Sequence, residues 1–156
     1  MRLTNEVMSD FGFRMSERPN FKSAIIRNPK SQIRIEKAMD KKLLQERFKK
    51  YAVSIVKFSE GLPDQSGFRT VRNQIVRSGP SSAANYRAAC RAKSTADFIH
   101  KMGTVEEELD ETMFWLEFTV ELSEEYQPMV SPLWKEGDEL LAIIVSSIIT
   151  AKKNRG

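Results

Sequence analysis

Apolar residues recur at spacings of three and four along most of the chain after about residue 37, which is the period of a helix with one buried face. The first such stretch covers residues 37–61, and Gly61 and Pro63 supply the stop signal at its end. Its apolar positions are Leu44, Phe48, Tyr51, Ile55, Phe58 and Leu62. The pattern predicts one long amphipathic helix.

A second apolar stripe begins near Phe68 and continues into a segment of small residues after residue 80. Pro80 lacks a backbone donor and clashes with the carbonyl of the preceding turn, so a kink or short break is expected at residues 78–80. We interpret Gly79, Pro80 and Asn85 as a structural hinge, with the Asn85 amide hydrogen-bonding across the kink. The small residues after the kink favour close approach of another helix.

Two further helices follow, each with its own start signal. Ser94 and Asp97 have the spacing of a capping box, so a third helix is expected from Thr95 to about residue 123. Pro132 is suited to the first position of a fourth helix, whose apolar face extends to Ile149. Four amphipathic helices with short connections predict an all-α, up-down-up-down four-helix bundle with a kinked second helix.

The chain divides into an extension, residues 1–36, and the bundle, residues 37–156. The extension has no sustained apolar period, and Gly12, Pro19 and Pro29 interrupt it, so we expect a basic, poorly ordered, flexible segment. An ordinary tail and a nucleic-acid-binding arm are both compatible with it. Met39, just before the first strong helical pattern, is a candidate internal translation start.

The composition offers little material for catalysis or metal binding. Cys90 is the only cysteine and His100 the only histidine, so neither disulfides, thiolate metal clusters nor histidine-assisted nucleophiles are expected. The acidic run at residues 106–111 lacks the histidines that di-iron bundles use. No apolar run reaches the ~20 residues that cross a bilayer. We expect a cytoplasmic protein that is not an enzyme, has no cofactor or metal, and does not enter a membrane.

Charge is distributed very unevenly along the chain. Residues 1–38 carry 8 basic and 4 acidic residues, and residues 39–101 carry 13 and 5. Residues 102–156 reverse the balance, with 4 basic and 12 acidic residues. The formal net charge of +4 therefore describes a strongly dipolar chain rather than a uniformly basic one.

The basic side chains of the second helix are the strongest chemical signal. At 100° per residue, its arginines fall within roughly 140° on the side away from the apolar stripe. Guanidinium groups bind phosphate oxygens bidentately and stay charged at every relevant pH. The candidate nucleic-acid-binding residues are Arg69, Arg72, Arg77, Arg87, Arg91 and Lys93. The alternative is that they pair with Glu106, Glu107, Glu108, Asp110 and Glu111, within or between subunits.

Three segments carry a resemblance to a known family: VRNQIVRSGPSSAANYRAA at residues 71–89, KSTADFIHK at residues 93–101, and ELDETMFWLE at residues 108–117. In order, spacing and residue type they resemble the four-helix-bundle proteins encoded in intervening sequences of bacterial large-subunit ribosomal RNA genes. The accessory variability determinants of diversity-generating retroelements are related to that family. The resemblance covers residues 43–154 and leaves residues 1–38 outside it.

The resemblance implies a ring-like homopentamer. It also implies, for the retroelement branch, binding to nucleic acid and assistance to a reverse transcriptase through a basic surface. Two functions stay open at this point. One is a homo-oligomeric accessory protein that binds RNA or DNA phosphates. The other is a protein-interaction scaffold, in which the basic second helix and the acidic third helix serve oligomer assembly and partner docking.

Overall fold

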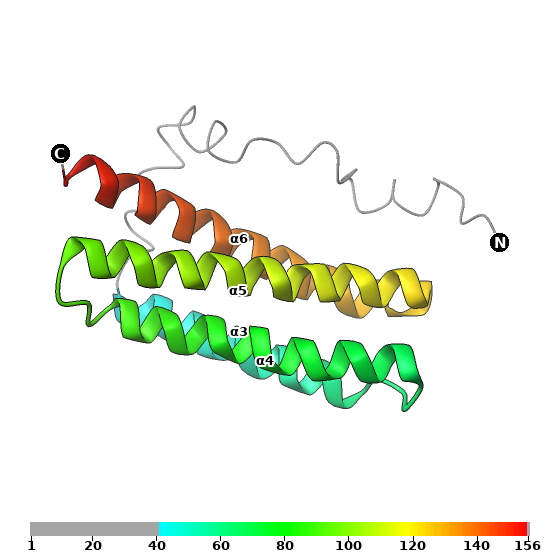
Figure 1. The fold of residues 1–156 in the computed structure, drawn as a ribbon. Helices are drawn as coiled ribbons and strands as arrows, with labels where there is room; N and C mark the ends of the chain where they lie inside the picture. Colours follow the sequence, from blue (N-terminus) through cyan, green and yellow to red (C-terminus); the bar gives the residue numbers. More distant parts are fainter. Residues whose placement is uncertain (1–40, 156) are drawn as a thin grey trace.

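The computed structural model describes residues 41–155, and these fold into four long α-helices packed side by side (Figure 1). The elements are α3 (Lys41–Glu60), α4 (Ser66–Ala89), α5 (Thr95–Leu122) and α6 (Gln127–Lys153), with a single 3-10 turn, η3 (Glu124–Tyr126), leading into α6. Consecutive helices run in opposite directions, and α6 also packs against α3 to close the bundle. The predicted all-α, up-down-up-down bundle is confirmed.

Some expectations fall on residues that the structure does not describe. The extension at residues 1–36, the helix start near Lys37 and the candidate start at Met39 all lie outside residues 41–155. The described part of the first helix ends at Glu60, where the Gly61 N–H donates to the Phe58 carbonyl at 3.1 Å. The turn at Gly61 therefore ends this helix as the sequence predicts.

The start of α5 shows how a local signal fixes a helix end. The Ser94 hydroxyl accepts a hydrogen bond from the Asp97 N–H at 3.1 Å, and the Asp97 carboxylate accepts one from the Lys93 backbone N–H at 3.0 Å. Lys101, one turn later, donates to the same carboxylate. The bond from Lys101, followed by the one from Lys93, lowers the pKa of Asp97. The predicted start at Thr95 is confirmed.

The apolar stripes of the four helices meet in one core. Phe48 stacks on Tyr86 with ring centroids 4.7 Å apart, which joins α3 to α4. The largest fully buried side chains are Phe48, Ile55, Ile75, Met102, Leu109, Leu116, Leu140, Ile144, Val71, Val105, Val120 and Val130. All four helices contribute to this set, so burial of apolar surface is the main force that holds them together.

Two glycines let helices approach closely inside this core. Gly79 of α4 lies against Ile55 of α3, and Gly137 of α6 lies against the Tyr51 hydroxyl. Within residues 41–155 the buried Tyr51 hydroxyl has no hydrogen-bond partner, and burial raises its pKa. Gly79 therefore acts as a contact point between helices.

Two proline positions correct the expectations from sequence. The expected break at residues 78–80 does not occur, because α4 continues through Pro80 as one helix; the bend at Pro80 stays a prediction. The Asn85 amide donates to the Ser81 carbonyl at 3.0 Å, one turn beyond Pro80, and so does not bridge the carbonyl that Pro80 leaves unpaired. Pro132 lies inside α6, and Pro128 occupies the first turn instead.

Candidate nucleic-acid interface

The antiparallel arrangement gathers basic residues at one end of the bundle. The start of α3, the end of α4, the start of α5 and the end of α6 all lie at this end (Figure 1). Residues 41–50, 87–101 and 152–155 contain 12 lysines and arginines and 2 acidic residues, a net charge of +10. The rest of residues 41–155 contains 5 basic and 14 acidic residues, a net charge of −9. The bundle therefore has a strongly positive end, and the rest of residues 41–155 is negatively charged.

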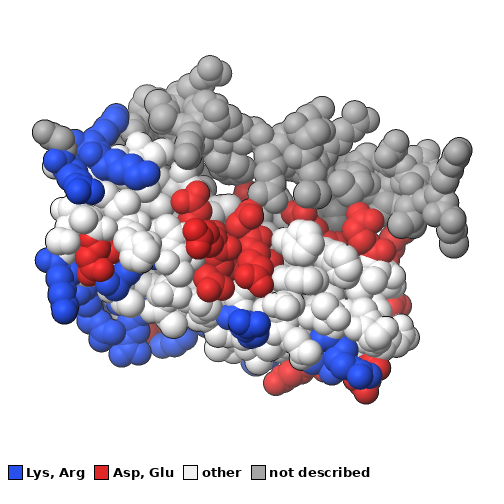
Figure 2. Space-filling view, in the orientation of Figure 1, with Lys and Arg blue, Asp and Glu red and all other residues white. Residues whose placement is uncertain are grey.

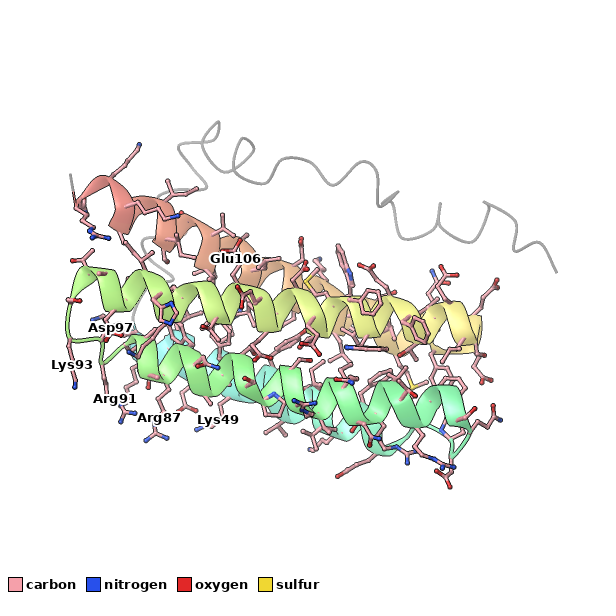
Figure 3. The ribbon with its side chains drawn as sticks, viewed as in Figure 1. Lys49, Arg87, Arg91, Lys93, Asp97 and Glu106 are labelled. Carbon is pink, nitrogen blue, oxygen red and sulfur yellow. The ribbon has the colours of Figure 1, made fainter. Side chains whose placement is uncertain are left out.

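We call the exposed cations of this region the basic end. Its members are Lys41, Lys42, Lys49 and Lys50 of α3, Arg87 of α4, Arg91 and Lys93 of the following turn, and Lys152, Lys153 and Arg155 at the end of the chain. Basic side chains gather at this end of the molecule in Figure 2. Arg87, Arg91 and Lys93 point outward on the same side as Lys49 (Figure 3).

Most of the basic end is available to a ligand. Among residues 41–155, no ion pair or side-chain hydrogen bond engages Arg87, Arg91 or Lys93, nor the three cations that close the chain. The two acidic residues of the region are engaged, since Asp97 pairs with Lys101 and Glu46 with Lys49. The positive charge is therefore exposed to solvent instead of being neutralised by neighbours.

The helix dipoles favour the cations that lie in the last turns of α4 and α6. α4 and α6 both end at this end of the bundle, and their last carbonyls carry partial negative charge. Arg87 lies in the last turn of α4, and Lys152 and Lys153 lie in the last turn of α6. The folded bundle offsets part of the repulsion among these side chains.

The candidate basic residues from the sequence do not form one patch. Arg69 and Arg87 are 18 positions apart, which is about 27 Å along a helix. Arg69 lies in the first turns of α4 at the opposite end, where it donates to Asp64 at 3.3 Å. The structure brings together only Arg87, Arg91 and Lys93.

Arg72 has a structural role at the opposite end. Its guanidinium donates to the Leu62 carbonyl, and to the Pro63 carbonyl at 3.1 Å, so it ties α4 to the loop that follows α3. Its Nε is buried without a hydrogen-bond partner within the described chain. Such a side chain cannot turn to a phosphate without releasing the loop.

Replacing Arg72 with methionine, which keeps an unbranched side chain, is expected to lower the free energy of unfolding by about 1–2 kcal/mol, because two backbone carbonyls lose a charged donor. Arg69→Met is the matched control and is expected to change it by less than about 0.5 kcal/mol, since that side chain is exposed. Urea unfolding measures both. Equal stabilities for the two variants would contradict the loop-fastening role.

Arg77 occupies the middle of α4 and lines a shallow polar cleft of about 320 Å³ with Glu108 and Glu111 of α5. Ser78 and Ser81 complete the lining. Within residues 41–155, no ion pair joins an arginine of α4 to Glu106, Glu107, Glu108 or Glu111 of α5, whereas Arg69 pairs with Asp64 in the preceding loop. Pairing between the α4 arginines and carboxylates of another subunit stays a prediction.

The contribution of α3 and α6 to the basic end was not predicted from the sequence, which pointed only to the basic residues of residues 69–93. The signal that finds the cations of α3 and α6 is topological, since in an antiparallel bundle the end of the second helix and the end of the fourth lie together.

No group of three or more histidine, cysteine, aspartate or glutamate side chains within residues 41–155 is arranged to hold a metal ion. No helix in this range has the length and apolar character that crossing a membrane requires.

Comparisons with known proteins show one family match and one similar solved structure. The model of the 23S rRNA-intervening sequence protein family matches residues 41–146. A solved structure from Bacteroides thetaiotaomicron, described as a protein with unknown function from the S23 ribosomal protein family, is 29% identical in sequence. The match covers 70% of this chain and 98% of that chain, with a TM-score of 0.65. A search of curated proteins found no match.

Proposed function

The chain belongs to the 23S rRNA-intervening sequence protein family, and we propose that it is a non-enzymatic accessory protein that binds nucleic acid through its basic end. The phosphate backbone is the chemical group that this surface fits, because a dense set of lysines and arginines releases counterions when it meets RNA or DNA. The side chains that make this contact are those of the basic end. Arg69, Arg72 and Arg77 have no part in it.

One observation carries the proposal. Six cations at one end of the bundle have exposed side chains that form no ion pair or hydrogen bond within residues 41–155: Arg87, Arg91, Lys93, Lys152, Lys153 and Arg155. An uncompensated cluster of this kind repels itself in the folded protein, and an anionic ligand removes that repulsion. Phosphates spaced along a nucleic-acid strand supply several anions at once.

Self-association fits the same proposal. A homo-oligomer, pentameric as the family resemblance implies, presents several basic ends to one nucleic acid. Linking modest sites in this way raises the overall affinity without a new contact. Assistance to a reverse transcriptase is the narrower form of the proposal, in which the basic ends hold an RNA template.

The charge separation also favours a second candidate, a protein-interaction scaffold. The basic end of one subunit complements the acidic remainder of another, which carries a net charge of −9. Charge complementarity of this kind steers association and fixes orientation. If the protein is a scaffold of this kind, its oligomers are expected to dissociate when salt is raised, which sedimentation would show as a lower molecular mass. Such a protein is expected to have no measurable affinity for RNA.

The affinity of the full chain for a fluorescently labelled RNA is expected to fall steeply with salt. If all six of these cations meet phosphates, the slope of log Kobs against log salt is about −4 to −5.5. Fluorescence anisotropy between 50 and 300 mM NaCl, roughly the range in which such slopes are linear, gives this slope. A slope near zero, or no binding at low salt, would reject the proposal.

A further inference from the structure

The outward face of α5, around Phe114, is only partly covered by the rest of the bundle: at its edges Glu117 accepts a hydrogen bond from Trp134 of α6, and Phe118 packs against the small apolar cluster around Phe68. Taking Phe114 as the centre, at 100° per residue, the side chains of residues 106–122 that lie within about 60° on this face are Glu107, Asp110, Glu111, Glu117, Phe118 and Glu121. Five of these six side chains are carboxylates and none is a lysine or arginine. Phe114 itself remains 43% exposed and Leu122, one turn after Phe118, remains 40% exposed.

This face combines exposed apolar surface with negative charge. Phe114, Trp115 and Phe118 form a cluster of rings with centroids 5.0–6.0 Å apart. Glu111 and Glu117 accept hydrogen bonds from the indole N–H groups of Trp115 and Trp134, at 3.3 and 2.8 Å. In Figure 2, acidic side chains gather over the middle of the molecule. The surface suits a segment that is both basic and apolar.

We infer that residues 21–35 of the same chain dock on this outward face of α5. That segment, FKSAIIRNPKSQIRI, contains four basic residues and no acidic residue. Its large apolar residues are Phe21, Ile25, Ile26, Ile33 and Ile35. Apolar surface and charge on the segment therefore match apolar surface and opposite charge on the face, which is the complementarity that helix-face recognition uses.

The chain is long enough for this contact to be intramolecular. α3 begins at Lys41, at the same end of the bundle as Thr95, the first residue of α5. Phe114 lies 19 residues beyond Thr95, which is about 29 Å along the helix. Residues 21–40 reach up to about 66 Å when extended, enough to pass around the neighbouring helix and follow α5.

Covalent attachment favours the chain's own segment over a free partner. A tethered segment meets its site at an effective concentration in the millimolar range, so weak contacts suffice. The docked segment covers Phe114 and Phe118 and places its cations beside the carboxylates of α5. This contact is independent of nucleic-acid binding at the basic end, because the two surfaces share no residue.

The test uses the full chain and zero-length carbodiimide cross-linking between lysines and carboxylates. Unlabelled and 15N-labelled protein are mixed in urea and refolded together. Cross-links from Lys22 or Lys30 to Glu107, Glu111 or Glu121 are then identified by mass spectrometry. In the expected products, both cross-linked peptides are unlabelled or both are 15N-labelled, because the two peptides come from one chain. Isotopically mixed products would show that the segment docks on a second copy and would overturn the inference, as would the absence of these cross-links.

A second measurement follows access to the segment. Chymotrypsin is expected to cleave after Phe21 about tenfold faster in the variant Glu107→Lys/Glu111→Lys/Glu121→Lys than in the wild type, because cleavage follows the undocked population. The control Glu60→Lys/Glu124→Lys/Glu125→Lys makes the same change of charge elsewhere and should keep the wild-type rate. Equal rates in all three proteins would overturn the inference, and circular dichroism confirms that each is folded.

Discussion

Replacing Gly79 with alanine is expected to lower the free energy of unfolding by about 1–3 kcal/mol, the usual cost of forcing an extra carbon into a packed core. A Cβ at this position would lie 2.7 Å from the Ile55 Cγ2 and 3.1 Å from the Ile55 Cβ. Ile55 is fully buried, and its Cβ is joined directly to the backbone of α3. Relief therefore requires α3 and α4 to move apart.

Gly103→Ala is the matched control, because both glycines lie inside helices and gain the same helix propensity on substitution. A Cβ at Gly103 would meet nothing within 4 Å, so this variant is expected to gain about 0.5–1 kcal/mol. The difference between the two variants isolates the steric cost at the α3–α4 contact. Urea unfolding gives both free energies, provided that the two variants have equal dependence on urea concentration. If Gly79→Ala were as stable as Gly103→Ala, the close approach of α3 and α4 at Gly79 would not be required for stability.

The core could be read from the sequence because burial in a bundle follows a local period. Leu44, Phe48, Tyr51 and Ile55 recur every three or four residues, and all four are buried. The start of α5 was equally accessible, since Ser94 and Asp97 interact across three residues and need no distant partner. Signals that act within one helical turn are visible before the fold is known.

The misplaced start of the fourth helix also has a local cause. Pro128 and Pro132 are four positions apart, and either can begin a helix. In the structure, Pro128 lies in the first turn of α6. Pro132 is tolerated one turn later, because the backbone carbonyl that loses its hydrogen bond there is that of Pro128, an exposed residue whose carbonyl can bond to water. At Pro80, the neighbouring contacts of α4 with α3 and α5 hold the helix continuous.

The candidate site was predicted less well because it depends on topology. A helical projection places the arginines of α4 on one side, but it discards their positions along the axis. Arg72 donates hydrogen bonds to the loop carbonyls of Leu62 and Pro63 and so does not join the other arginines at the surface. No local sequence pattern reveals these contacts. The cations of α6 join Arg87 only because the helices alternate in direction.

Reversing three charges at the basic end is expected to weaken RNA binding by at least about 100-fold in 0.1 M salt. The variant is Arg87→Glu/Arg91→Glu/Lys93→Glu. Each lost charge-assisted phosphate contact removes on the order of 1 kcal/mol, and three such losses multiply to a factor of about 150. The new carboxylates also repel the strand, and the slope against salt should become less steep by about 2–3.

The control Lys57→Glu/Arg69→Glu/Lys135→Glu changes the net charge by the same amount at the other end of the bundle. Because a Debye length is about 10 Å at this salt concentration, charges so far from the basic end are screened from a strand bound there. The control is expected to lose less than about threefold in affinity. Equal losses in the two variants would mean that net charge alone governs binding, and the basic end would then have no special role. Fluorescence anisotropy with one RNA at matched salt distinguishes the two results.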